Sequence, residues 1–514
     1  MTKKILIVFA IVVVLGILLG VGANYWIDRK LPSLLRAKND SPFEITYRNL
    51  DMSLFSRTIT ATDIFLVPKN SVGSANQKPG FYADVQKIKV SGFGIFDMLF
   101  NDRISAKSLL VDKPNLTILR DADVKKHKPI QQDVLEPLRK IIRVDDLELK
   151  NANITIRQLE QEKTTLDVRN TTINLTGITL SDVTLNRKIP FTYKTYSVNC
   201  ESLTYRTPVY EIRSGKIETV NDGLTLLDFS LKPRMSREAF SRSLKVEKDL
   251  FDASAKVLAL DKIDWGYDGN LLYCHIGTIF FDGLDAEIFR DKTVADDKKK
   301  KKLYSEQLRN IGFNLTVGLL QFKDSKLAYE ERKDKDDGPG RLTFDHFNLK
   351  ATGITSGMAA NSKEDVRIKV ACRFMDAAPF NVDWSFNVLD KSEKFRIIGH
   401  IRDFPSKALI PFTKPYVNAE FEGKLDEVRF DFTGNDNGTS GTFSLEHSNF
   451  KVNVLKKDGK EKNKLVSAIA NIFVKKDSNE KPKTVKVSVE REKDKSFFNL
   501  LWKSVSDGLK KTLL

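Results

Sequence analysis

Few residues of this 514-residue sequence have both the type and the spacing that catalysis or metal binding requires. The five histidines stand apart from one another, and none lies in the His-x-x-x-His or Cys-His spacing that is typical of a metal site. They are His127, His275, His346, His400 and His447. We therefore predict no bound metal and no cofactor.

Motifs for nucleotide binding or nucleophilic catalysis are missing as well. There is no Gly-x-Ser-x-Gly elbow and no Gly-rich phosphate loop, and Gly92-Phe93-Gly94 falls well short of a dinucleotide fingerprint. Asp145 and Asp146 are adjacent carboxylates of the kind that glycosidases use, but such pairs arise readily among 68 acidic residues. We predict that the protein is not an enzyme and has no catalytic residues.

The net charge of +16 suits nucleic acid, anionic lipid headgroups, or solubility alone. Two dense basic runs, residues 125–128 and 298–302, adjoin acidic or proline-containing sequence, which favours solvated loops. No zinc-finger spacing or aromatic RNA-binding signature accompanies them, so we predict no nucleic acid partner. Cys200, Cys274 and Cys372 lie in apolar contexts and are odd in number, which indicates buried thiols rather than a disulfide framework.

The N-terminal residues have the composition of a membrane anchor. Residues 5–23 are uncharged and apolar, and as a helix at about 1.5 Å per residue they would cross a hydrocarbon core. Lys3 and Lys4 precede this segment, and Tyr25 and Trp26 follow it at the interface. We predict a transmembrane anchor over residues 1–27. A cleavable signal peptide is the alternative, and either one exports the rest of the chain.

The remainder of the chain is dominated by strand patterns. Apolar and polar residues alternate in many segments after residue 43, including residues 82–90, 366–370 and 485–489. Helical patterns are few, at residues 135–142, 237–250, 303–311 and 465–474. We predict a mainly β fold in which an elongated, curled antiparallel sheet follows the anchor. Its first part spans residues 28–300 and its second part spans residues 301–494.

A weak internal repeat supports a sheet made of stacked hairpins. Residues 147–156 match residues 320–329 in pattern, and the identical Thr-Gly-Ile-Thr step follows each, at residues 176–179 and 352–355. Each unit predicts a strand, a polar turn and a returning strand with the same apolar face. Such a face can curl on itself, pack on a second sheet, or remain as an apolar trough, and the pattern does not choose among these.

The chain ends in a segment of helical period. Over residues 495–514 the apolar residues Phe498, Leu501, Trp502, Val505 and Leu509 fall on one stripe, with lysines mostly off it. This predicts an amphipathic helix that either plugs the end of the sheet or contacts a membrane interface.

These features together resemble the AsmA-like family of Gram-negative envelope proteins, of the AsmA and TamB type. The resemblance is carried by residues 104–118, a strand, a step containing Pro114 and a second strand, and by the closing segment from Phe497 to Lys510. It implies an inner-membrane, single-pass protein whose body lies in the periplasm, with a β-groove of apolar interior and a role in phospholipid transport or outer-membrane maintenance. It implies no catalytic residues. The length of this chain departs from that of the largest members, which places a complete bridge across the periplasm in doubt.

Two functions therefore follow as hypotheses. The first is a protein that shields or moves phospholipid in a hydrophobic β-groove, since apolar surface is stabilised by about 25 cal/mol per Å² when it leaves water. Its lining would be one set of alternating residues, for instance Val85, Ile88 and Val90 or the opposite set. The second is a non-catalytic scaffold whose sheet edges recruit other envelope proteins.

Overall fold

The computed structural model describes residues 43–513, and the gaps in this range are residues 54–55, 72–77, 95–102, 121–140, 160–162, 182–183, 185–190, 221, 270, 335–337, 360–363 and 456–482. The chain divides into two compact units, Met1–Thr219 and Val220–Leu514. The predicted transmembrane anchor at residues 1–27 lies outside the described residues. Of the helices that the structure does describe, none combines the length and the apolar character needed to cross a membrane.

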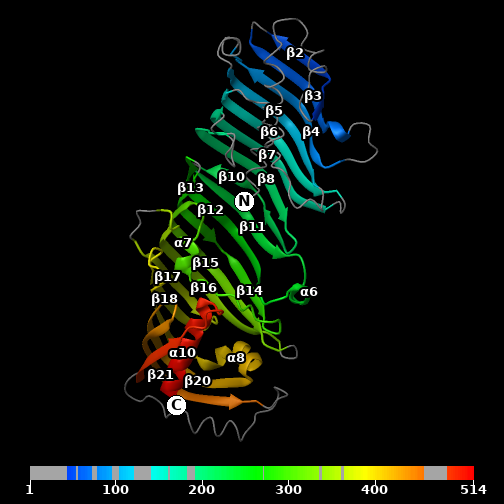
Figure 1. Cartoon of the computed structure of the whole chain (residues 1–514). Helices are drawn as coiled ribbons and strands as arrows, with labels where there is room; N and C mark the ends of the chain where they lie inside the picture. Colours follow the sequence, from blue (N-terminus) through cyan, green and yellow to red (C-terminus); the bar gives the residue numbers. More distant parts are fainter. Residues whose placement is uncertain are drawn as a thin grey trace. The chain divides into compact units, whose positions relative to one another are not determined.

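The first unit is built from strands (Figure 1). They are β1 (Phe43–Thr46), β2 (Asn49–Ser53), β3 (Thr58–Pro68), β4 (Gly80–Ser91), β5 (Arg103–Arg120), β6 (Ile141–Gln158), β7 (Lys163–Leu180), β8 (Thr195–Arg206), β9 (Tyr210–Ser214) and β10 (Ile217–Val220), with the short 3-10 helix η1 (Lys69–Ser71) after β3. Strands β3 to β8 pair in chain order, β1 and β2 both pair with β3, and β9 and β10 both pair with β8.

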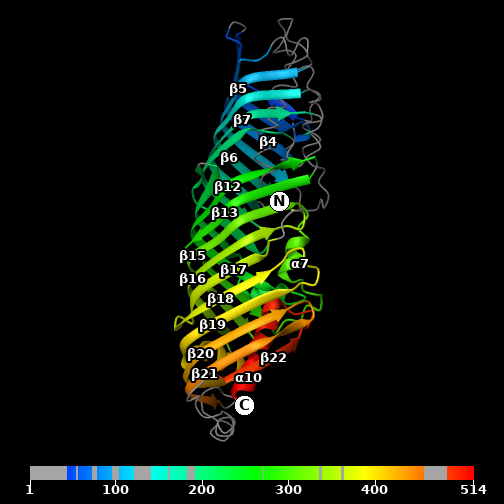
Figure 2. The same ribbon diagram turned by 90° about the vertical axis from the view of Figure 1, so that its left-hand side faces the viewer.

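The second unit is a longer run of strands with helices along it. The strands are β11 (Gly223–Pro233), β12 (Asp249–Asp268), β13 (Leu271–Asp282), β14 (Asp285–Asp291), β15 (Asn314–Arg332), β16 (Gly340–Thr355), β17 (Val366–Phe374), β18 (Ala378–Phe386), β19 (Phe395–Pro405), β20 (Ala419–Gly434), β21 (Gly438–Val454) and β22 (Lys483–Glu490). Figure 2 shows β15 to β21 side by side. The expected mainly β architecture is therefore confirmed.

The sheets are mixed rather than purely antiparallel, so that part of the prediction is wrong. Strand β5 pairs with β6 in parallel, and β15 pairs in parallel with both β13 and β14. A parallel pair needs a crossover of a dozen or more residues. The crossover from β14 to β15 meets this need with residues 292–313, which include a short helix. Alternation within a strand does not reveal the direction of its neighbour.

Among the described residues, every helix but α10 (Phe497–Leu513) is short. These helices are α6 (Arg237–Ser243), α7 (Tyr304–Arg309), the 3-10 helix η2 (Ser406–Leu409), α8 (Ile410–Val417) and α10. Helices α6, α7 and α10 fall within predicted segments, although the segment at residues 237–250 is helical only to Ser243 and its last two residues belong to β12. Helix α8 was missed because Pro411 and Pro415 mask its helical pattern. The predicted helix at residues 135–142 is wrong at its last two residues, which belong to β6, and its remainder lies outside the described residues, as does the one at residues 465–474.

The long strands bend where single residues take left-handed backbone angles. In the second unit, Asp324 of β15 and His346 of β16 have φ values of 42° and 46°, and His346 Nδ1 lies 3.0 Å from Asp324 Oδ1. In the first unit, Asn151 of β6 and Asn170 of β7 have φ values of 52° and 44°. Asn and Asp adopt this conformation at lower cost than most residues. The register between the paired strands shifts at these points, so each bend is a β-bulge.

Both hairpins predicted from the repeat are present, which confirms that part of the sequence analysis. Strand β6 pairs antiparallel with β7, and β15 pairs antiparallel with β16. Equivalent residues of the repeat also share their backbone conformation. Asn151 and Asp324 are both left-handed, and so are Gly177 and Gly353, with φ values of 60° and 73°. The repeated polar and glycine positions therefore mark where each hairpin bends.

The first unit buries its apolar face almost completely. Val85, Ile88 and Val90 of β4 are 1–4% exposed, and their partners on β5 include Val111 and Leu109, which are 1% and 2% exposed. The face that contains Val85 is thus the buried one, and the alternative set on β4 points the other way. These side chains form a closed core in the described structure.

We predict that Gly353→Ala destabilises the protein, because φ is +73° and a Cβ atom at residue 353 would lie 2.5 Å from the backbone oxygen of Asp365. The expected loss in the free energy of unfolding is about 1–3 kcal/mol, measured by guanidinium denaturation. Gly312→Ala is the matched control, since nothing lies within 4 Å of its Cβ position. Equal stability of the two variants would contradict the bend at Gly353.

Candidate functional site: an apolar face on the second unit

The strand register of the second unit aligns apolar side chains into two continuous rows. Within one strand the two rows are two residues apart, so they share a face. The first row is Leu226, Leu258, Phe281, Phe322, Leu349 and Val370, and the second is Leu224, Leu260, Ile279, Leu320, Ala351 and Ile368. We call these twelve residues, which run from β11 to β17, the apolar strip.

The strip is only partly shielded from water. Every one of its side chains is partly exposed except Ala351, which is 2% exposed. It crosses six strands, β11, β12, β13, β15, β16 and β17, so its five inter-strand steps of about 4.8 Å make it roughly 24 Å long. The rings of Phe281 and Phe322 meet edge to face at 5.1 Å in its middle. A contiguous apolar surface of this kind marks an interaction site more often than isolated exposed residues do.

From β15 to β18 the opposite face of the sheet is polar. Gln321, Lys350, Lys369 and Asp383 are partners in register there, and Lys369 lies 4.0 Å from Asp383. The two side chains of this ion pair are 79% and 62% exposed. From β15 to β18, alternation therefore gives one polar and one apolar face, as the sequence predicted, whereas on β12 and β13 the face opposite the strip also carries Ala259 and Phe280.

Beyond β18 the same rows become buried, whereas Val382 and Trp384 of β18 are still partly exposed. They continue through Trp384 and Ile397 to Phe432, and through Val382 and Gly399 to Phe430. Ile397, Phe430 and Phe432 are 4%, 6% and 0% exposed. Helix α10 packs against β21 and β22 and closes this end of the face (Figures 1 and 2).

Aromatic rings form the boundary between the open strip and the buried end. The ring of Phe497 from α10 stacks on Trp384 at 4.6 Å and meets Phe395 edge to face at 5.1 Å. Tyr304 of α7 packs edge to face on Trp384 at 5.1 Å and on Phe498 at 6.4 Å. We call Tyr304, Trp384, Phe497 and Phe498 the aromatic collar. Phe498 is 58% exposed, so the collar itself is reachable from solvent.

Helix α10 docks through a different face from the predicted one. Its buried residues are Phe497, Leu500, Ser504, Gly508 and Thr512, whereas Phe498 and Trp502 are 58% and 48% exposed. Leu501, Val505 and Leu509 are only partly buried against the core. The sheet explains this choice, because the ring of Phe443 fills the space beside residue 508. A helix can approach that closely only through small residues, and Ser504 adds a 2.6 Å hydrogen bond with the Thr439 hydroxyl.

The basic run at residues 298–302 is a loop that also anchors the crossover between β14 and β15. The amide of Lys301 donates to the carbonyl of Lys493 at 2.8 Å. Asp436, in the turn between β20 and β21, binds Lys300 at 3.1 Å and Lys493 at 2.8 Å, and it also pairs with Arg491. The run forms neither helix nor strand, and Lys298, Lys299, Lys300 and Lys302 are exposed, so the interpretation as a solvated loop is confirmed for this run even though it also makes these contacts. Residues 125–128 lie outside the described residues.

Where β14, β15 and β12 end, the apolar face has a polar border. Arg290 donates two hydrogen bonds to Asp249, at 2.6 and 2.7 Å, and Tyr329 donates to Glu331 at 2.5 Å. Burial, with the nearby charge of Glu331, raises the pKa of Tyr329 well above its ordinary value, so its hydroxyl stays protonated. Burial and the nearby charge of Asp249 raise the pKa of Tyr304 as well. Charged and hydroxyl groups thus lie beside the collar.

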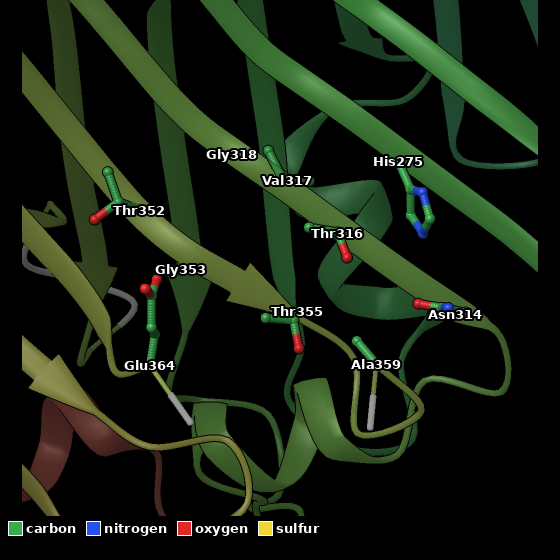
Figure 3. Close-up of a pocket in the computed structure, with 10 residues that line it drawn as sticks. All are labelled: His275, Asn314, Thr316, Val317, Gly318, Thr352, Gly353, Thr355, Ala359 and Glu364. Atoms are coloured by element: carbon green, nitrogen blue, oxygen red, sulfur yellow. The ribbon is translucent and has the colours of Figure 1, made fainter. Parts of the chain in front are cut away.

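The second unit also has a polar pocket of about 560 Å³ (Figure 3). Its lining is His275, Asn314, Thr316, Val317, Gly318, Thr352, Gly353, Thr355, Ala359 and Glu364. His275, Thr316 and Thr355 are partners in register on β13, β15 and β16. They alternate with a neighbouring apolar row that includes Ile354, and Ile354 packs against the same core as Ile368 of the strip.

This pocket has hydrogen-bonding groups but no catalytic pair. In the described lining, no hydroxyl is hydrogen-bonded to His275 or to Glu364, and His275 Nδ1 lies 3.9 Å from Asp264 Oδ2. Asn314 Oδ1 is buried without a partner among the described residues. The pocket is suited to a small polar molecule, and it shares no side chain with the strip.

The residues that the sequence singled out for chemistry are scattered. His346 lies at a strand bend, His400 contacts Glu427 at 2.7 Å, His447 is buried, and His127 lies outside the described residues. Throughout the described part of the chain, no three His, Cys, Asp or Glu side chains are grouped as metal ligands. Cys200 and Cys372 are buried, as expected, whereas Cys274 is only partly buried.

Sequence reasoning named a candidate lining in the first unit and missed the strip. Its members were visible as alternating apolar pairs, such as Leu258 with Leu260 and Leu320 with Phe322. What the sequence lacked was the register that aligns these pairs across six strands. The pairing of β13 with β15 in parallel, which skips over β14, was the step that alternation alone does not reveal.

No family model matches this sequence, and no curated protein matches it either.

We predict that Gly508→Ala lowers stability even though alanine favours a helix over glycine by about 1 kcal/mol. The new methyl group would overlap the ring of Phe443, so the expected loss in unfolding free energy is about 1–3 kcal/mol. Ser506→Ala is the control on the same helix. A stabilised Gly508→Ala variant in guanidinium denaturation would mean that α10 is not docked as described.

A second prediction concerns the stability of the protein at low pH. Burial tends to raise the pKa of Asp436, but its bonds to Lys493 and Lys300 and the charge of Arg491 hold the pKa below its ordinary value. Its stabilising contribution is therefore complete above the unfolded-state pKa of about 3.9 and is lost as pH falls below that value. In thermal melts, the stability gap between the wild type and Asp436→Asn should be constant from pH 7 to 5 and shrink below about pH 4. A gap that does not change with pH would contradict this ion-pair cluster.

Proposed function

We propose that this chain binds the acyl chains of lipids on the apolar strip of its second unit. In the cell it would act as a membrane-anchored periplasmic protein that shields or moves phospholipid and supports outer-membrane lipid homeostasis, as the AsmA-like resemblance implies. The anchor, the compartment and the lipid all belong to this proposal.

The observation that supports the proposal is that the side chains of the apolar strip are partly exposed to solvent. A single sheet with one apolar face needs a second layer over that face. In β19 to β22 the layer is α10, and the same rows there are nearly fully buried. From β11 to β17 the side chains stay partly exposed, which costs about 25 cal/mol for each Å² of apolar surface left in water. A bound acyl chain would recover that free energy.

The dimensions and the chemistry also fit an acyl lipid. The strip is roughly 24 Å long, whereas one leaflet of a bilayer is about 15 Å deep, half of a hydrocarbon core of about 30 Å. The polar border at Arg290, Asp249 and Glu331 supplies charged groups beside the apolar surface. An amphipathic ligand can therefore satisfy both regions at once.

The test is the amount of phospholipid that remains with the full-length protein after gentle detergent purification. Leu320→Asp places a charge in the strip, and we expect it to reduce the bound phospholipid at least several-fold in quantitative mass spectrometry, because a carboxylate would lose its hydration beside an acyl chain. Gln321→Asp is the matched control, since it introduces the same carboxylate at the next residue of β15, on the opposite face.

Lipid-free wild-type protein, or an equal loss in both variants, would contradict lipid binding on the strip. A lipid-free protein that purifies with a stoichiometric protein partner would instead support the alternative hypothesis of an envelope scaffold.

A further inference from the structure

The indole N–H of Trp384 has no hydrogen-bond partner among the described residues, although the nitrogen atom is buried. Buried tryptophan N–H groups usually find an acceptor, and an unpaired one is costly. Trp384 is also the residue at which the apolar strip ends, because it is the register partner of Ile368 and stacks on Phe497 of α10. A lone donor therefore lies at the closed end of an otherwise apolar surface.

Other polar groups lie around this donor. The ring of Tyr304 meets that of Trp384 at 5.1 Å, and the pKa of Tyr304 is raised by burial and by the charge of Asp249, so its hydroxyl remains protonated at neutral pH. Asp249 is itself paired with Arg290 through two hydrogen bonds. The closed end of the strip is thus its polar end, with two neutral donors and no unpaired charge among the residues named here.

Resting on the proposed function, we infer that the collar is a binding subsite for the carboxyl or ester oxygen of an acyl group, which accepts a hydrogen bond from Trp384 Nε1. The hydrocarbon tail then runs from the collar along the strip toward β11. The subsite binds a fatty acid or an acyl ester, whereas a pure hydrocarbon has no oxygen to accept the hydrogen bond from Trp384 Nε1. This orientation places the oxygen-bearing end of the ligand near the polar border and leaves only methylene groups against the two apolar rows.

Two probes whose fluorescence increases in apolar sites separate the hydrogen bond to the acyl oxygen from the apolar contacts of the tail. Parinaric acid carries a carboxyl group on a polyene chain, whereas diphenylhexatriene is a hydrocarbon without oxygen. Trp384→Phe keeps an aromatic ring and removes the N–H. In the full-length protein we expect this variant to bind parinaric acid about fivefold to tenfold more weakly, the equivalent of one lost hydrogen bond, and to bind diphenylhexatriene within about twofold of the wild type.

Trp265→Phe is the matched control, since it makes the same change on β12 outside the strip and the collar, and both probes should bind it as they bind the wild type. Tyr304→Phe is the second variant. It removes only a hydroxyl from a side chain that is 36% exposed, so it keeps the subsite testable if Trp384→Phe does not fold, and it should also weaken parinaric acid selectively. Circular dichroism and thermal melts confirm that each variant is folded.

The outcomes distinguish a failure of lipid binding on the strip from a failure of the subsite at the collar. If the wild type binds neither probe, the proposed function fails. If it binds both and Trp384→Phe weakens both equally or neither, lipid binding stands and the subsite is wrong. The indole N–H would then donate a weak hydrogen bond to the ring of Tyr304 instead of to a ligand oxygen.

Discussion

The second unit depends on one constraint, which is that a sheet with one apolar face must have that face covered. Register aligns apolar residues across the strands from β11 to β22, and from β15 to β18 it aligns polar residues on the other face. Where α10 lies on the apolar face, residues such as Phe432 and Phe443 are completely buried. Where no such burial occurs, the same rows form the strip. The buried core and the proposed site are thus two regions of one apolar face, the first covered by α10 and the second partly exposed.

Left-handed residues bend the long strands of both units. Strand β15, with 19 residues, is interrupted at Asp324, where a β-bulge shifts the register with β16 and increases the local twist. The amide of Asp324 donates to the side chain of Asn348 at 3.1 Å, so the backbone group released by the bulge remains satisfied. In the first unit Asn170 is held in the same way by Asn153, at 3.0 Å. Short polar side chains at these positions therefore serve backbone geometry rather than chemistry, even where a histidine is involved, as at His346.

Much of the fold could be read from alternation, and much of the site could not. Period-two patterns predicted strands, and the Thr-Gly-Ile-Thr repeat predicted two equivalent hairpins whose bends coincide at Gly177 and Gly353. The parallel pairings of β5 with β6 and of β15 with β13 and β14 were missed, because an apolar face looks the same beside a parallel or an antiparallel neighbour. The collar was also out of reach, since Tyr304, Trp384 and Phe497 are distant in sequence and meet only through a crossover and a terminal helix.

The sequence by itself determined the class of structure: strands with one apolar and one polar face, repeated hairpins, and a helix at residues 497–513. These are local properties, and side-chain periodicity encodes them. Only the tertiary structure decided which face of that helix is buried, because the bulk of Phe443 on the sheet excludes the larger residues and admits Gly508. It also decided where the apolar rows remain open to solvent, because exposure depends on what lies opposite a side chain, and period-two alternation contains no information about that partner.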